Sequence, residues 1–156
     1  MTAISKEIHN VPNLTFFGIN DNDIGDASIV AMSTRLKHLP ALRELRLGGN
    51  SLSVSGIRTF FAVISNMRNL DTLDLSSSSK DPARMDAKTV ASLVQAFPRL
   101  TALVILKLQN LAMKKAQLEK IMKAVEEHTK LHKIWCSKNL VAEVSKIRVQ
   151  SGITLN

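Results

Sequence analysis

Residues 42–52 read Leu42-Arg43-Glu44-Leu45-Arg46-Leu47-Gly48-Gly49-Asn50-Ser51-Leu52, and this stretch decides the fold. Leu45 and Leu47 alternate with polar residues, which is the period of a strand that buries one face. The pattern L-x-x-L-x-L-x-x-N-x-L returns in looser form along the chain, and such self-similarity indicates a repeat architecture. The five segments open at Leu14, Leu42, Leu70, Leu103 and Leu131.

The steps between successive segments are 28, 28, 33 and 28 residues. The fourth segment has two possible starts, because the flank Phe97–Leu100 resembles the flank Val11–Leu14. We favour Leu103 over the earlier start, since it aligns Leu106 and Leu108 with the pattern and restores the 28-residue step.

Between these segments, apolar residues recur with helical spacing. Within residues 55–66 they stand at i, i+3, i+4 and i+7, which forms one apolar face of a helix. The expected helices cover residues 27–38, 55–66, 86–97 and 115–127. This alternation predicts a parallel sheet on one side and a row of helices on the other. Because helices are wider than strands, the stack must curve with the strands on its inner surface.

In these features the chain resembles the leucine-rich-repeat family, and its helix-bearing 28-residue period resembles the ribonuclease-inhibitor-like subclass. The resemblance covers nearly the whole sequence. It implies one α/β domain over residues 1–156, a curved leucine-rich-repeat solenoid with parallel strands on the concave face and helices on the convex face. It also implies that the repeated asparagine pairs backbone groups where each strand turns outward. These asparagines are Asn22, Asn50 and Asn139, and Ser78 and Leu111 interrupt the row.

Three segments lie outside the regular pattern. Ser76–Asp86 lengthens the third repeat, and we expect a protruding loop there, whose serines are either a solvated turn or phosphorylation sites. Residues 2–10 indicate a short helix that either caps the first repeat or follows earlier repeats of a longer chain. Residues 141–149 indicate a last helix, Gly152 its stop and residues 153–155 a closing strand.

No constellation of catalytic or metal-binding residues is visible. The histidines, at positions 9, 38, 128 and 132, lack partners at ligand spacing. Cys136 stands at an inward position, where a buried structural thiol is expected. Gly48-Gly49 lacks the Lys-Ser/Thr that follows in a phosphate-binding loop. We therefore expect a protein that is not an enzyme, with no cofactor and no metal.

Three sequence features indicate the cellular compartment. The first residues lack the unbroken apolar stretch of a secretory signal, and no run reaches membrane-spanning length. A single cysteine fits a reducing environment. We expect the cytoplasm, or a host cytoplasm if the chain is a delivered effector.

Side chains that alternate with the core leucines face the other side of the sheet. Trp135 falls on this side, and tryptophan and arginine are enriched in binding hot spots. It is either the centre of a binding site or an aromatic that closes the end of the stack. The candidate partner-binding residues are Phe16, Asp21, Glu44, Arg46, Thr72, Asp74, Ile105, Lys107, Lys133, Trp135 and Lys138. Gly18, Gly49, Ser77 and Asn110 are expected on the same side.

The net charge of +8 is concentrated towards the C-terminus, where residues 103–156 hold ten Lys/Arg against four acidic residues. This asymmetry favours a partner with an acidic patch, although a solvated lysine-rich helix face gives the same count. We expect a monomeric protein-protein interaction module, a regulator or effector that binds on its concave face. The alternative is an anionic polymer or membrane surface, bound through the C-terminal lysines. These are Lys114, Lys115, Lys120, Lys123, Lys130, Lys133 and Lys138.

The resemblance implies a range of roles, because the subclass includes nuclease inhibitors, actin-filament-capping proteins, activators of small GTPases, immune-receptor sensors and bacterial effectors. Nuclease inhibitors are acidic, so the basic charge argues against that role. A GTPase activator would need an exposed arginine on a loop between repeats, for which Arg84 is the candidate. Base stacking is disfavoured, since Trp135 is the only aromatic residue after Phe97.

Overall fold

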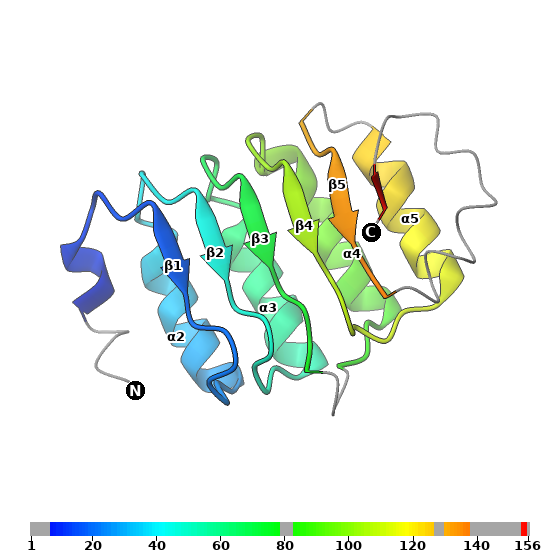
Figure 1. The fold of residues 1–156 in the computed structure, drawn as a ribbon, viewed down its shortest axis with the longest axis horizontal. Coiled ribbons are helices and arrows are strands. Elements are labelled where there is room, and N and C mark those ends of the chain that lie inside the picture. The colour runs from blue at the N-terminus through cyan, green and yellow to red at the C-terminus, as the bar shows by residue number, and fades with distance from the viewer. Residues whose placement is uncertain (1–6, 79–82, 127–129, 138–153, 156) are drawn as a thin grey trace.

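The computed structural model describes residues 7–78, 83–126, 130–137 and 154–155, and these residues form two layers (Figure 1). Short strands make up one layer, and the helices lie in a row behind them. The strands are β1 (Phe16–Gly18), β2 (Glu44–Arg46), β3 (Thr72–Asp74), β4 (Ile105–Lys107), β5 (Lys133–Trp135) and β6 (Thr154–Leu155). The α-helices are α2 (Asp26–Leu36), α3 (Val54–Ile64), α4 (Ala87–Ala96) and α5 (Lys115–Glu126), with 3-10 turns η1 (Ile8–Asn10) and η2 (Phe97–Arg99).

The sheet is parallel throughout, and its strands follow the chain in order from β1 to β6. Each helix returns the chain to the start of the next strand, which is the crossover that parallel pairing requires. Leu45 lies beside Leu73, and Leu73 lies beside Leu106. In this register Leu103 stands where Leu70 stands one strand earlier, so the later start of the fourth segment is the one observed.

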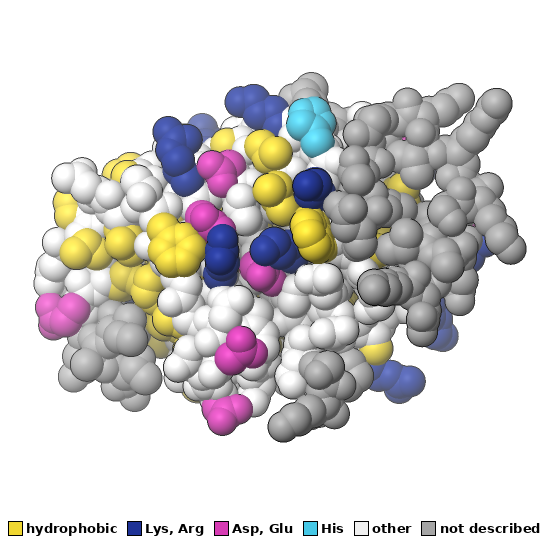
Figure 2. All heavy atoms as spheres, viewed as in Figure 1, with side chains coloured by type: hydrophobic (Ala, Val, Ile, Leu, Met, Phe, Trp, Pro, Cys, Tyr) yellow, Lys and Arg dark blue, Asp and Glu magenta, His cyan; other side chains and the backbone are white. Residues whose placement is uncertain are grey.

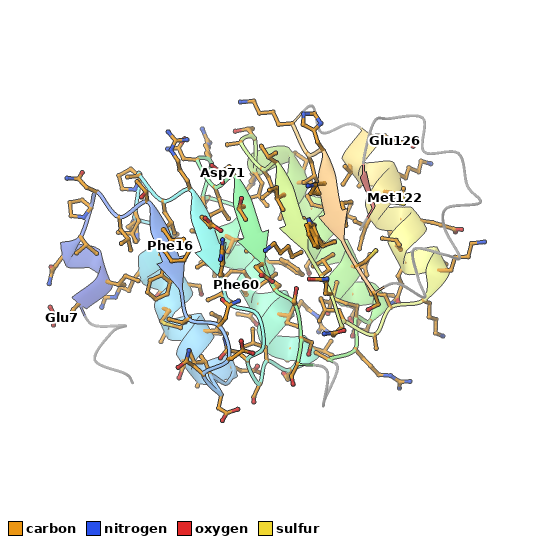
Figure 3. All side chains as sticks on the ribbon, viewed as in Figure 1. Glu7, Phe16, Phe60, Asp71, Met122 and Glu126 are labelled. Carbon is orange, nitrogen blue, oxygen red and sulfur yellow. The ribbon has the colours of Figure 1, made fainter. Side chains whose placement is uncertain are left out.

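The core lies between the two layers. The central residue of each strand from β2 to β5 is fully buried, and these residues are Leu45, Leu73, Leu106 and Ile134. The inner face of α3 meets them with Ile57, Phe60, Phe61 and Ile64, all buried. Figure 3 shows Phe60 behind the strands. Burial of each such side chain stabilises the fold by roughly 1.5–3 kcal/mol. Each repeat packs against its neighbours, so the core is shared along the stack.

Asn50 performs the backbone pairing that the resemblance implies. Its Nδ2 donates to the carbonyl oxygens of Ile19 at 2.9 Å and Leu47 at 2.8 Å. Its Oδ1 accepts from the N–H groups of Asn22 at 3.1 Å and Ile24 at 3.0 Å. Nδ2 also donates to the Gly48 carbonyl at a longer 3.4 Å. Asn50 is buried, so one amide satisfies five backbone groups of two repeats.

Asn22, a second consensus asparagine, does not repeat this arrangement. Asn22 is exposed, and its side-chain amide donates only to the nearby carbonyl of Asn20 at 2.6 Å. The prediction that Asn22 pairs the backbone groups at the end of its strand is therefore wrong. Asn50 of the next repeat pairs the N–H groups of Asn22 and Ile24 instead. Asn139 lies outside the described residues.

Side chains cap the starts of α3 and α4, and both capping residues also bond to a neighbouring repeat. The Ser53 hydroxyl accepts from the N–H groups of Ser55 and Gly56 at the start of α3. Asp86 accepts from Thr89 N–H at 2.7 Å at the start of α4, and its other oxygen pairs with Arg58 of α3 at 2.7 Å. Such bonds satisfy orphan N–H groups and fix each helix against the preceding one.

The expected elements are found with small shifts. The ends of the four long helices differ from the predicted ends by at most two residues. Ile8 in η1 is buried against the first repeat, and β6 is the expected closing strand. Residues 2–6, 141–149, Gly152 and Ile153 lie outside the described residues.

Hydrogen bonds fix the first residues that follow β3, Ser76 and Ser77. The Ser77 hydroxyl accepts from Ala83 N–H at 3.0 Å, and the Ser76 hydroxyl accepts from Gln109 N–H at 3.3 Å. Ser77, expected to face outward, is buried, because its hydroxyl closes this turn. Among the described residues, no helix has both the length and the apolar character needed to span a bilayer.

Candidate partner-binding surface

We define the strand face as the outward-pointing side chains of β1 to β5. They include Phe16, Glu44, Arg46, Thr72, Asp74, Ile105, Lys107, Lys133 and Trp135. Figure 2 views this side of the molecule and shows acidic, basic and apolar side chains intermixed across it. No helix crosses in front of β1 to β4 (Figure 1), so this part of the sheet is open to solvent.

The N-terminal half of the strand face holds an exposed aromatic ring. Phe16 is 47% exposed and stands out from β1 in Figure 3. The Arg46 guanidinium carbon lies 5.3 Å from the centre of the Phe16 ring, and Arg46 Nε lies 2.5 Å from Glu44 Oε1. The carboxylate and the ring together hold the guanidinium, so Phe16 and Arg46 form one preformed feature.

The C-terminal half is centred on Trp135, which is half-buried. Lys107 Nζ lies 5.7 Å and Lys133 Nζ 5.6 Å from the indole ring. Lys107 also pairs with Asp74, with 3.6 Å between Nζ and Oδ2. The indole Nε1 is shielded from solvent and has no hydrogen-bond partner among the described residues. The indole ring is therefore flanked by two cations, while its N–H is turned away from solvent.

Asp74 lies on the strand face, the side of the sheet predicted for it, but is only 7% exposed. Besides the Lys107 pair, its Oδ1 accepts from Ser76 N–H at 3.0 Å. Asp74 therefore fixes the end of β3 and the position of Lys107, and its removal affects folding as well as the surface.

Two candidate residues are not part of the strand face as described. Asp21 follows β1, is exposed and has a positive φ of 56°. Its carboxylate packs against Gly49, where φ is +70° and a Cβ would collide with Asp21. Asp21 therefore shapes a turn beside the sheet. Lys138 lies outside the described residues.

Those C-terminal lysines that the structure describes do not form one patch. Lys120 and Lys123 are exposed on α5 in the helix layer, and Lys115 on the same helix lies 3.8 Å from Glu119. Lys133 belongs to the strand face, beside Trp135. The positive charge is thus divided between two sides of the molecule, which weakens the case for a single anionic-surface site.

The thiol of Cys136 is buried, as expected from its inward position. Burial raises the pKa of Cys136 to about 11, from an ordinary value of 9.0. A nucleophilic cysteine needs the opposite shift and an exposed sulfur. Within the described residues, no group of three His, Cys, Asp or Glu side chains is placed to hold a metal ion.

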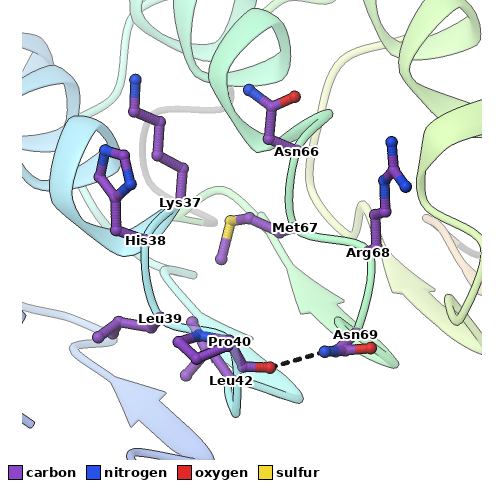
Figure 4. Close-up of a pocket in the computed structure, with 9 residues that line it drawn as sticks. All are labelled: Lys37, His38, Leu39, Pro40, Leu42, Asn66, Met67, Arg68 and Asn69. Carbon is purple, nitrogen blue, oxygen red and sulfur yellow. Dashed lines mark hydrogen bonds between the residues drawn. The ribbon is translucent and has the colours of Figure 1, made fainter. Parts of the chain in front are cut away.

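A small basic hollow of about 260 Å³ lies between the turns that follow α2 and α3 (Figure 4). Lys37, His38 and Arg68 surround it, and Asn69 Nδ2 closes one side by donating to the Pro40 carbonyl at 2.7 Å. Basic side chains beside helix C-termini complement the negative end of the helix dipole. Helix termination therefore accounts for this hollow without a ligand.

Arg58 and Gln117 are placed in a larger hollow at the starts of the helices, and nothing in the repeat pattern marks them. The one available signal is the 28-residue spacing of Arg58 and Asp86, which matches the repeat step and which the ion pair uses. Charge pairing at the repeat step is a usable clue for contacts between neighbouring helices.

No protein-family model matches the chain. In sequence it is similar to Baculoviral IAP repeat-containing protein 1 of Homo sapiens, with 33% identity over 101 residues, or 64% of this chain. The chain spans 7% of the length of that curated relative.

In structure the chain is similar to Leiomodin-1 Actin-Binding Site 2, with a TM-score of 0.76 and 15% identity. That match covers 97% of this chain and 90% of the other. An internalin of Listeria monocytogenes matches at a TM-score of 0.45 and 14% identity, over 95% of this chain and 48% of that one. The sheet order, the helix layer and the leiomodin likeness show that this chain has the fold of a curved leucine-rich-repeat solenoid.

Proposed function

We propose that this chain is a non-catalytic module that binds a protein partner through the strand face. The observation that carries the proposal is the pair of aromatic side chains, Phe16 and Trp135, each held beside a cation on an open parallel sheet. Aromatic and arginine side chains supply most of the energy of protein interfaces. Fixing them before binding lowers the entropy lost on association.

The charges of the strand face support a protein partner with an acidic patch near Trp135. Arg46 is paired with Glu44 and Lys107 with Asp74, whereas Lys133 makes no ion pair among the described residues. Because Arg46 and Lys107 are already paired with carboxylates, the strand face offers a mixed pattern of charges. Such a pattern suits a protein with complementary charges better than a uniform polyanion. We propose that Lys133 and Lys138 provide the attraction and Trp135 the buried contact.

The finer features of the fold belong to the same proposal. We infer one domain over residues 1–156, with five repeats of the ribonuclease-inhibitor-like kind and a dominant step of 28 residues. The spacing of the paired strands supports this step, since Phe16 pairs with Glu44 and Glu44 with Thr72. A cytoplasmic, monomeric regulator or effector is consistent with this role.

Monomeric actin is the first probe for a partner, because the similar solved structure is an actin-binding site. The proposal does not depend on actin. A photo-crosslinking amino acid placed at Phe16 or Trp135 identifies other proteins, with the same group at Lys120 on α5 as the control. Crosslinks from the two strand-face positions and none from Lys120 support the proposal, and crosslinks only from Lys120 would refute it.

Binding kinetics then separate this proposal from the alternative of an anionic polymer or membrane surface. With a crosslinked partner, Trp135→Ala should weaken binding by about 2 kcal/mol or more through faster dissociation. The matched control replaces Lys115, Lys120 and Lys123 with Gln and should change mainly the salt dependence. The reverse result, with unchanged affinity for Trp135→Ala and a steep loss with salt, would favour the alternative.

A further inference from the structure

A hollow of about 870 Å³ lies on the edge of the molecule where α3, α4 and α5 begin, away from the strand face. We name it the helix-start hollow, and its main lining residues are Val54, Arg58, Arg84, Met85, Met113 and Lys114. Its volume is several times that of the basic hollow in Figure 4 and falls in the range of ligand and peptide sites.

The backbone segments that border the hollow are fixed to each other by hydrogen bonds. Arg84 and Ala112 form an isolated parallel bridge, in which Met85 N–H donates to the Ala112 carbonyl at 3.0 Å. Gln117 joins the same segments, because its Nε2 donates to the Met85 carbonyl and its Oε1 accepts from Lys114 N–H at 2.7 Å. The two sides of the hollow are therefore held together by hydrogen bonds in the free protein.

The floor is apolar and adaptable. Met85 is almost fully buried, Met113 and Val54 are half-buried, and small exposed residues keep the space above them open. Those small residues are Ala87, Ala112 and Ala116. Methionine side chains adjust their shape to different apolar groups, so this floor suits a medium-sized apolar side chain.

The rim is positive and only partly neutralised. Arg58 is paired with Asp86, whereas Arg84 and Lys114 are exposed and make no ion pair among the described residues. Lys114 and Lys115 stand at the start of α5, and the first turn of that helix holds no acidic residue. Cations at this end oppose the helix dipole, so the arrangement costs stability and favours an approaching anion.

We propose that the helix-start hollow is a second docking site, which binds a short acidic peptide segment of a protein partner. An apolar side chain of the peptide rests on Met85 and Met113, and flanking carboxylates pair with Arg84 and Lys114. The apolar floor between two cations that make no ion pair within the described part of the chain carries this assignment, and it stands independently of the strand face. Binding at both sites would let one partner grip the sheet and the edge together.

The test uses fluorescein-labelled synthetic peptides in which one Leu, Met or Phe stands between glutamates, with glutamine-for-glutamate peptides as matched controls. Fluorescence anisotropy should show preferential binding of glutamate peptides by the full chain. The double charge reversal R84E/K114E should weaken binding by about tenfold or more. The matched reversal K120E/K123E, on α5 but outside the hollow, should leave most of the affinity, and Trp135→Ala should leave all of it.

Methyl NMR of the chain labelled at methionine locates the peptide without relying on variants. The methyl signals of Met85 and Met113 should shift on peptide addition, and that of Met32, on the buried face of α2, should not. Equal binding of glutamine peptides, equal losses for the two charge reversals, or shifts that spare Met85 and Met113 would each overturn the proposal. Binding only by phosphorylated peptides or by anionic lipid vesicles would overturn it as well.

Discussion

Asn50 and Asn22 stand at equivalent positions of neighbouring repeats but have different surroundings. Asn50 is buried and its side chain bonds to five backbone groups, whereas Asn22 is exposed and its side chain bonds to one. Asn50→Ala leaves two N–H and three carbonyl groups without that partner, and we expect a loss of about 2–4 kcal/mol in unfolding free energy. Asn22→Ala is the matched control and should cost under about 0.5 kcal/mol by urea denaturation. Equal midpoints for the two variants would contradict this reading.

Leu73 and Asp74 are adjacent, and both are buried on opposite sides of β3. Leu73→Ala should cost roughly 2–5 kcal/mol, because it opens a cavity in the core. Asp74→Ala should cost less, about 1–2 kcal/mol, since it removes the acceptor of Ser76 N–H and the partner of Lys107. Asp74→Asn keeps an acceptor and should recover part of that loss. Thermal unfolding ranks the three variants, and a neutral Asp74→Ala would show that these bonds do not stabilise the fold.

Cys136 is the only cysteine, so its labelling is unambiguous. Its pKa is raised to about 11 by burial, which means that the folded protein holds the thiol proton more tightly than the unfolded chain. The stability from this proton is complete below pH 9 and is lost as the pH rises from 9 towards 11. The difference in stability between the wild type and Cys136→Ala should therefore shrink over that interval. A difference that stays constant from pH 8 to 11 would argue against the buried thiol.

At the scale of the elements, α4 depends on Asp86, which caps it and pairs with Arg58 of α3. The hydrogen bonds from Thr89 lower the pKa of Asp86 from its ordinary value of 3.8, with the Arg58 charge acting in the same direction. The stabilisation is present above that value and is lost as the pH falls below it. Asp86→Ala should lower the melting temperature at pH 7 and have little effect near pH 2. Asp86→Ser keeps a capping oxygen but loses the charge, so its melting temperature at pH 7 should lie between those of the wild type and Asp86→Ala.

The helices and strands were open to prediction from sequence because periodic burial fixes them. Leu73, for example, is fully buried at the phase that its repeat position predicts. The individual polar contacts could not be predicted, because the repeat pattern gives the side of the sheet on which a side chain lies and not how exposed that side chain is. Asp74 shows this limit, since it lies on the predicted side yet is buried by Lys107 and the Ser76 turn. The helix-start hollow was also missed, because its lining comes from three helix starts that no single motif joins.

For the whole molecule, stacked repeats share one core, and we expect them to unfold together. Trp135, the only tryptophan, reports on the C-terminal half, whereas circular dichroism reports on all helices. Transitions followed by the two probes in urea should coincide, with one midpoint. Leu45→Ala, in β2 and far along the sheet from Trp135, should shift both midpoints equally. A Trp135 transition that ignores Leu45→Ala would mean that the two halves unfold separately.

The longer step between β3 and β4 bears on engineering of this scaffold. Leu73 still lies beside Leu106 although the step between them is 33 residues, and the additional length falls between the end of β3 and the start of α4. The connection from β3 to α4 is therefore longer than its counterpart from β2 to α3 without a change in strand register. An epitope or a fluorescent peptide grafted between Ser78 and Ala83 would therefore leave the sheet as it is. Inserting a single residue within a strand would instead move the following side chains of that strand to the other side of the sheet.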